Sequence, residues 1–230
     1  MSLEVRRAGS RFVTVEEGRE TRHSFSFGPH YDPGNLGFGL LVSHNDDLLA
    51  PGAGYPDHPH QEIEVVTWVL SGALAHRDSV GSSGVLLPGE VQVMSAGTGV
   101  VHSEFAAPGA GETRFVQTWV RPDAWGATPA YASAAVGPGS GWTAVVGGDG
   151  LPLGARAATL WVSDAAAGDT LVVPEVPHAH LFVATGAADV VDALGPVVDL
   201  GEGDAVRVVG RGADLVVTAP GQLMLWTFDS

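Results

Sequence analysis

Short runs of apolar residues, rich in Val, Leu and aromatic side chains, recur along the whole chain with Gly or Pro near their ends. Runs of this length and composition predict β-strands, and Ser71-Gly72 and Pro88-Gly89 predict tight turns between them. The strands predicted in the first half are Leu36–Ser43, Ile63–Leu70, Gly84–Leu87, Glu90–Ser95 and Arg114–Val120. Helical spacing of apolar residues is rare, and Asp46–Ala50 could form at most one short turn of helix. The pattern therefore predicts an all-β protein.

Short apolar runs at a similar spacing recur in the second half of the chain. Before it lies GATPAYASAAVGPGSG, residues 126–141, which we interpret as an interdomain connection that is partly ordered because it carries Tyr131. The strands predicted beyond it are Ala158–Val162, Thr170–Val173, His180–Ala184, Ala188–Val191, Ala205–Val209, Leu215–Ala219 and Leu223–Phe228. Two successive sets of short strands favour two small β-barrels in tandem, residues 1–127 and residues 128–230.

The composition is that of an ordered, acidic protein. Hydrophobic residues make up 45% of the chain and charged residues 16%, a balance typical of a folded globular protein. The formal net charge is -15, and every basic residue is an arginine. Such a surface repels phosphate backbones, so direct nucleic-acid binding is disfavoured, while binding to a protein partner stays compatible with the charge.

The chain contains no cysteine, which limits the bonds and metal ligands that it can supply. No disulfide and no thiolate metal site can form, which leaves imidazole and carboxylate groups as candidate ligands. The first residues, MSLEVRRAGSRFV, lack the apolar core of a signal peptide, and Gly, Pro or a charge interrupts every apolar run before membrane-spanning length. We therefore expect a soluble cytoplasmic protein without a membrane anchor.

Two pairs of polar residues have the spacing of metal ligands on strands. His58 and His60 are two residues apart, and side chains two apart in an extended segment point to the same face. His102 and Glu104 repeat this spacing further along the chain. On facing strands of a small barrel the two pairs would offer three imidazoles and one carboxylate, with coordination positions left open. That donor set suits a divalent transition metal of the iron, nickel, copper or manganese type.

A single His-x-His pair would be a weaker signal, because such pairs in polar loops are commonly exposed. Pro59, between the two histidines, also removes a hydrogen-bond donor from any strand that contains it. The second pair makes a metal site the stronger interpretation. Among the other histidines, His76 is expected to support the barrel, and His23 and His30 to line a cavity mouth or to bond to a neighbouring loop.

The segment Gly54–Phe105, GYPDHPHQEIEVVTWVLSGALAHRDSVGSSGVLLPGEVQVMSAGTGVVHSEF, closely resembles the pirin family of bicupins. His23–Pro33 and Arg114–Pro122 fit the same family. The resemblance implies two tandem cupin, jelly-roll-like β-barrels. It also implies one divalent metal in the N-terminal barrel, usually iron as Fe(II), with Ni, Mn, Cu or Zn as alternatives. The residues that correspond to the family's metal ligands are His58, His60, His102 and Glu104.

Glu64 is a second candidate for the carboxylate ligand. General cupins draw the carboxylate from the first motif, where Glu64 stands, so Glu64 is kept as an alternative to Glu104.

In the second half, His178 and His180 echo the first motif, but no histidine follows in Asp214–Ser230. We therefore expect a cupin-like domain without a complete metal site there.

The resemblance to short bacterial pirins with quercetinase-like activity implies a metal-dependent dioxygenase. Its substrates would be O2 and a flavonol such as quercetin, with Glu104 as the general base for the flavonol hydroxyl. The alternative is a non-enzymatic, metal- and redox-sensing regulatory protein that binds a protein partner. A third interpretation is an inert barrel whose metal only holds strands together, although open coordination positions argue against it.

Overall fold

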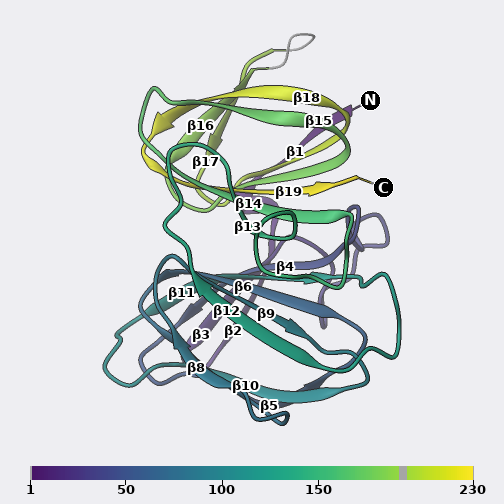
Figure 1. Ribbon diagram of the computed structural model, residues 1–230. Coiled ribbons are helices and arrows are strands. Elements are labelled where there is room, and N and C mark those ends of the chain that lie inside the picture. The colour runs from purple at the N-terminus through teal and green to yellow at the C-terminus, as the bar shows by residue number, and fades with distance from the viewer. Residues whose placement is uncertain (1, 192–195, 230) are drawn as a thin grey trace. The chain divides into compact units, whose positions relative to one another are not determined.

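The computed structural model describes residues 2–191 and 196–229, and these residues form β-structure almost throughout (Figure 1). The one helical element among them is the short 3-10 turn η1 (Ala8–Ser10). The prediction of an all-β chain is confirmed. Contacts divide the described residues into two compact units, which we call the first β unit (Phe12–Val136 and Leu151–Arg156) and the second β unit (residues 2–11, 137–150, 157–191 and 196–229). The division into folding domains at residues 127 and 128 stays a prediction.

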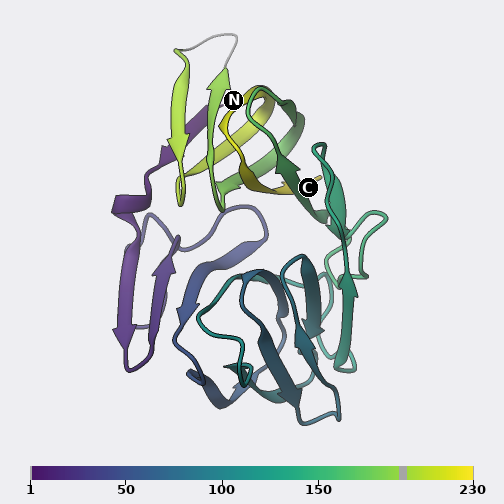
Figure 2. The same cartoon turned by 90° about the vertical axis from the view of Figure 1, so that its left-hand side faces the viewer.

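The first β unit contains two antiparallel sheets. The larger has the strand order β12 (Ala130–Ala135), β9 (Glu90–Ser95), β6 (Glu64–Ser71), β11 (Thr113–Val120), β4 (Leu41–Leu49), β3 (Arg19–His23) and β2 (Phe12–Glu16). The smaller has the order β5 (Gly54–His60), β10 (Val100–Ala106), β7 (Leu74–Asp78) and β8 (Ser83–Leu86). Figure 2 shows these strands from the side.

Apolar side chains from both sheets meet in one buried cluster, so the sheets pack face to face. Leu49, Val69 and Phe115 come from the larger sheet, and Leu74 and Leu86 from the smaller. All five are at most 2% exposed. Burying each such side chain contributes about 1.5–3 kcal/mol, and this packing fixes the distance between the two inner faces.

The predicted turn at Ser71-Gly72 joins β6 to β7. Gly72 has a φ of +74°, in the left-handed region that glycine adopts without strain. A Cβ atom there would also lie 2.5 Å from the Glu112 carbonyl oxygen. The turn therefore needs glycine both for its backbone conformation and for its close approach to the start of β11.

The structure corrects the prediction for the segment around Asp46. Residues Asp46–Ala50 were a candidate helical turn, but Asp46–Leu49 lie inside β4, which begins at Leu41 and not at Leu36. Buried carboxylates are tolerated in this strand because they have partners. Arg114 on the adjacent strand β11 donates to both oxygens of Asp46, at 2.9 and 3.0 Å.

Residues 126–141, predicted as a partly ordered connection, contain a strand. Ala130–Ala135 form β12, an edge strand that pairs with β9 from Ala130 opposite Ser95 to Ala135 opposite Glu90. The run of small residues has little strand preference of its own, and pairing with an existing sheet supplies the hydrogen bonds. Tyr131 is thereby placed beside the interior of the first β unit.

The second β unit consists of one eight-stranded sheet. Its strands are β1 (Ser2–Arg6), β13 (Thr143–Val146), β14 (Ala158–Ala165), β15 (Thr170–Val183), β16 (Ala187–Val191), β17 (Val198–Gly201), β18 (Ala205–Ala219) and β19 (Gly221–Phe228). The long neighbours β15 and β18 each merge two predicted strands, and they run antiparallel to each other (Figure 1). A register shift between Val173 and Val176 marks where the sequence pattern breaks.

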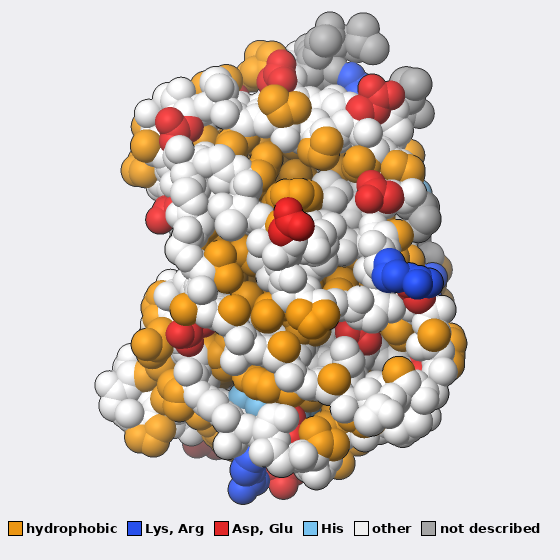
Figure 3. Space-filling model, in the orientation of Figure 1, with side chains coloured by type: hydrophobic (Ala, Val, Ile, Leu, Met, Phe, Trp, Pro, Cys, Tyr) orange, Lys and Arg blue, Asp and Glu red, His pale blue; other side chains and the backbone are white. Residues whose placement is uncertain are grey.

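The surface agrees with the acidic composition. On the face shown in Figure 3, carboxylate side chains are scattered widely and arginine side chains are few. Among the described residues, no helix is both long and apolar enough to cross a membrane.

Candidate metal centre

Strand pairing brings the two predicted ligand pairs together. β5 and β10 are antiparallel neighbours, and His58 lies directly opposite His102. β5 is the edge strand of its sheet, which explains why it tolerates Pro56 and Pro59. The ring centroids lie 4.3 Å apart for His58 and His102, 5.0 Å for His58 and His60, and 4.9 Å for His60 and His102. One ring nitrogen from each histidine lies within 4.8 Å of the other two.

The hydrogen bonds indicate which nitrogens converge. His58 Nδ1 lies 2.8 Å from the Pro56 carbonyl oxygen, so it donates there and leaves Nε2 with a lone pair. His102 Nδ1 lies 3.5 Å from His76 Nδ1, outside the cluster. Within residues 2–191 and 196–229, the buried Nε2 atoms of His60 and His102 have no hydrogen-bond partner. A buried polar atom without a partner is costly, and a metal ion would satisfy both atoms.

The protonation of these imidazoles also suits a cation. Burial, together with the neighbouring His58, lowers the pKa of His60 to about 4. Burial lowers the pKa of His102 to about 2, with contributions from His58, His60 and His76. Both rings are therefore neutral at physiological pH, which is the form that binds metal. The donors present fit a divalent transition metal.

Glu104 reaches the same region from β10, two residues after His102. An irregularity in the pairing with β5 lies between these two residues and sets Glu104 opposite Tyr55. Gln92 Nε2 donates to Glu104 Oε1 at 2.7 Å, and Gln117 Nε2 donates to Oε2 at 2.8 Å. Glu104 forms a second potential ligand group with His76 and His102, again within 4.8 Å. Its carboxylate is therefore held beside His102 but is not part of the tight group of three histidines.

The Glu104 carboxyl is buried, and its surroundings shift its pKa in opposite directions. Burial raises its pKa to about 7, while the hydrogen bonds from Gln117 and Gln92 favour the ionised form and oppose this rise. Both glutamines extend from the larger sheet, whereas Glu104 belongs to the smaller one. The three side chains thus join the two sheets across the interior.

Glu64, the alternative carboxylate, lies elsewhere. It faces Ser95 in the pairing of β6 with β9, and Ser95 Oγ donates to Glu64 Oε2 at 2.6 Å. Gln92 lies three positions before Ser95, so strand alternation turns it to the opposite face of the sheet. The Gly154 backbone N–H donates to Glu64 at 3.1 Å, and a Cβ at Gly154 would lie 2.5 Å from Glu64 Oε1. Glu64 therefore anchors a chain segment and belongs to neither histidine group.

His76 has contacts that its sequence context did not suggest. His76 Nε2 lies 3.2 Å from Asp78 Oδ2, and its ring stacks on Tyr131 with centroids 4.6 Å apart. With Nε2–H donating to Asp78, His76 Nδ1 carries the lone pair that faces His102. His76 supports the barrel as expected, and it also contacts a candidate ligand directly. Period-two alternation on β7 could have placed it on the inner face with Leu74 and Asp78.

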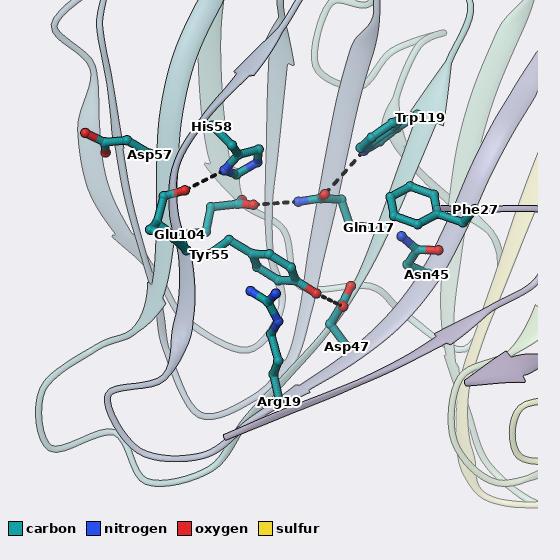
Figure 4. A pocket seen from close by; sticks show the side chains of 11 residues that line it. Arg19, Phe27, Asn45, Asp47, Tyr55, Asp57, His58, Glu104, Gln117 and Trp119 are labelled. Carbon is teal, nitrogen blue, oxygen red and sulfur yellow. Dashed lines mark hydrogen bonds between the residues drawn. The ribbon is translucent and has the colours of Figure 1, made fainter. Parts of the chain in front are cut away.

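A cavity of about 360 Å³ opens beside this cluster (Figure 4). Its walls carry three aromatic side chains, Phe27, Tyr55 and Trp119. The other lining residues are Arg19, Asn45, Asp47, Pro56, Asp57, His58, Glu104 and Gln117. Two members of the candidate centre, His58 and Glu104, thus face a space of the size that small-molecule ligands occupy.

Two further histidines lie behind the cavity wall. His23 Nδ1 is 2.9 Å from Asn45 Oδ1, and its ring stacks on Phe27 with centroids 4.9 Å apart. The Thr14 hydroxyl contacts His23 Nε2 at 2.9 Å and His30 Nε2 at 3.1 Å. In the second β unit, His178 and His180 belong to neither of the potential ligand groups among the described residues.

Fold and site together define a double cupin-type protein with a histidine–carboxylate centre in one of its two β units. The family model of pirin matches residues 4–120. The chain belongs to the pirin family. A relative from Mycobacterium tuberculosis strain H37Rv, named "Putative quercetin 2,3-dioxygenase", is 42% identical over 236 residues, covering 98% of this chain and 94% of that protein.

Two Escherichia coli proteins extend the comparison. A protein from strain K12 named quercetin 2,3-dioxygenase is 39% identical over 127 residues, which cover 55% of each chain. The bacterial pirin YhhW, solved in complex with nickel(II), superimposes with a TM-score of 0.90 at 26% identity and covers 99% of both chains. The prediction of a pirin-type double cupin fold is confirmed, and the identity of the metal is not fixed by these likenesses.

Proposed function

We propose that this protein is a metal-dependent dioxygenase that cleaves flavonols such as quercetin with O2. One observation carries the proposal: His58 and Glu104 of the candidate centre line a 360 Å³ cavity that also has aromatic walls. A bound metal would thus be open to a flat aromatic molecule, as catalysis requires and as a purely structural ion does not. The names of the relatives support the same activity.

We propose His58, His60, His102 and Glu104 as the metal ligands. The three imidazoles would bind through Nε2, the atoms that the local hydrogen bonds leave without a partner. Fe(II) is the ion that the family resemblance implies, and Ni, Mn, Cu or Zn would fit the same donors. When bound, the ion supplies Lewis-acid polarisation of the flavonol oxygens and the electronic coupling to O2.

The chain's own side chains would bind and deprotonate the substrate. Phe27, Tyr55 and Trp119 offer aromatic faces and edges for a planar ring system. Glu104 would accept the proton of the flavonol hydroxyl. Gln92 and Gln117 hold the carboxylate from behind, so its orientation is set before the substrate enters.

The test is oxygen consumption with quercetin by protein loaded separately with Fe, Mn, Ni and Cu. We expect loss of quercetin and uptake of O2 in equal amounts with at least one metal, and no loss of quercetin under argon. Isotopically labelled O2 should enter the product. The variant His102→Ala should be inactive with every metal. Quercetin loss at equal rates with and without oxygen would contradict the dioxygenase and favour a binding or regulatory protein.

A further inference from the structure

Two polar side chains on β4, neither of them a candidate ligand, line the cavity. Asn45 and Asp47 are two residues apart, so strand geometry turns both toward the same side and sets them roughly 6–7 Å apart along the strand. Asn45 is 5% exposed and Asp47 is 2% exposed. Figure 4 shows both on the wall that also carries Tyr55 and Phe27.

One oxygen of Asp47 is fully used by the protein. Thr21 Oγ1 lies 2.6 Å from Asp47 Oδ1 and Tyr55 OH lies 2.5 Å from it, and both hydroxyls donate to that oxygen. Within residues 2–191 and 196–229, the second oxygen, Oδ2, has no hydrogen-bond partner. Asp47 thus offers an acceptor at the cavity, and the two donors behind it fix the orientation of the carboxylate.

Asn45 is oriented in the same way. His23 Nδ1 donates to Asn45 Oδ1 at 2.9 Å. The amide nitrogen, Nδ2, has no partner among the described residues. The wall therefore presents one donor and one acceptor, each on a buried side chain that is held by a bond from behind. Buried polar atoms that lack protein partners in a cavity are the groups that recognise a ligand.

We propose that Asn45 and Asp47 select phenolic substrates, with Asp47 Oδ2 accepting a phenolic O–H and Asn45 Nδ2 donating to a phenolic oxygen. The proposal rests on the proposed function, because a bound ion would fix the opposite end of the same molecule. The cavity wall carries three carboxylates, on Asp47, Asp57 and Glu104, against one guanidinium, on Arg19, so aryl carboxylates are disfavoured and neutral phenols favoured. Substrates without hydroxyl groups beyond the chelating pair would leave Asp47 Oδ2 unpaired.

The test uses Ni(II)-loaded protein under argon, so that binding is measured without turnover. Quercetin carries several phenolic hydroxyls, whereas the one hydroxyl of 3-hydroxyflavone chelates the metal together with the keto oxygen. We expect the parent to bind quercetin more tightly than 3-hydroxyflavone. Asp47→Asn keeps the acceptor for Thr21 and Tyr55 but turns an N–H group toward the cavity. It should weaken quercetin binding roughly ten- to hundredfold and leave 3-hydroxyflavone binding within about twofold.

Two more variants test whether the change in quercetin affinity is specific to Asn45 and Asp47. Asp123→Asn changes a carboxylate that does not line the cavity and is bonded to Arg156, so it should leave both affinities unchanged. Asn45→Ser removes the amide donor and shortens the side chain. It should weaken quercetin binding selectively, which covers the case in which Asp47→Asn fails to fold. Equal weakening of both flavonols by Asp47→Asn or Asn45→Ser would overturn the proposal.

The binding result is separable from the proposed function. If the parent consumes quercetin with O2 but shows no preference for quercetin over 3-hydroxyflavone, the dioxygenase stands and the role of Asn45 and Asp47 is wrong. If Asp47→Asn loses the preference but no metal supports oxygen-dependent turnover in the parent, the recognition site stands and the dioxygenase is wrong.

Discussion

The side-chain amide of Gln117 donates to Glu104 Oε2 at 2.8 Å across the interior between two sheets. β11 and β10 carry these residues and belong to different sheets. An ionised carboxylate accepts about four hydrogen bonds or coordinate bonds, so one bond to each oxygen still leaves lone pairs for a cation. The sheet packing thus positions Glu104 before any ion arrives.

Replacing the two candidate carboxylates should separate their roles. Glu104→Gln should weaken metal binding by roughly one to two orders of magnitude, because it removes the negative charge beside His102 and sets an amide against the Gln92 and Gln117 donors. Glu64→Gln should change metal affinity far less and act mainly on stability through Gly154. Competition with a chromophoric chelator measures both affinities, and the reverse ranking would restore Glu64 as the ligand.

The contact between His76 and His102 predicts a positioning effect. His76→Ala should lower metal affinity about tenfold or more, because His102 Nδ1 loses its partner and the ring is less firmly oriented. The d–d absorption of Co(II)-loaded protein should shift, which a purely structural role of His76 would not cause. His178→Ala, in the second β unit, is the matched control. An unchanged Co(II) spectrum in His76→Ala would remove this role.

The paired spacing of the ligand candidates explains what the sequence could predict about the centre. Side chains two residues apart on a strand share one face, and this spacing relates His58 to His60 and His102 to Glu104. The structure brings the three imidazoles together. Whether all four bind a metal stays a prediction. The choice between Glu64 and Glu104 could not be made from spacing, because the face on which Glu64 lies depends on its pairing with Ser95.

The parts that sequence reasoning missed depend on tertiary context. Gln92 and Gln117 are neutral amides within apolar strands, and only the second sheet gives them a carboxylate to hold. Asp47 lies in a segment whose polarity favours a turn, and it is buried because Thr21 and Tyr55 satisfy it. Ala130–Ala135 becomes a strand only by pairing with β9. In each case the deciding partner is distant in sequence.

The buried Asp47 predicts a characteristic pH dependence of stability. Burial raises its pKa from the model-peptide value of 3.8 to about 6, so between these values the folded state binds the proton more tightly than the unfolded state. Stability from this group is therefore greatest at low pH and is lost as the pH rises through that window. Asp47→Asn lacks the effect.

Denaturation of metal-free parent and Asp47→Asn at a series of pH values measures this. The free energy of unfolding of the parent, relative to the variant, should fall by on the order of 3 kcal/mol from pH 4 to pH 7. The shifted histidines and Glu104 are present in both proteins, so their contributions largely cancel. A difference that is constant with pH, or that rises, would contradict a raised pKa for Asp47.

The most direct test of the account is the metal content of the protein and of its ligand variants. Protein purified without chelator, or stripped and reloaded with a divalent transition metal, should contain close to one equivalent per chain by elemental analysis. His58→Ala, His60→Ala and His102→Ala should each lose most of that metal, whereas His178→Ala and His180→Ala should keep it. Two tightly bound ions in the parent, or full retention in His102→Ala, would contradict a single centre in the first β unit.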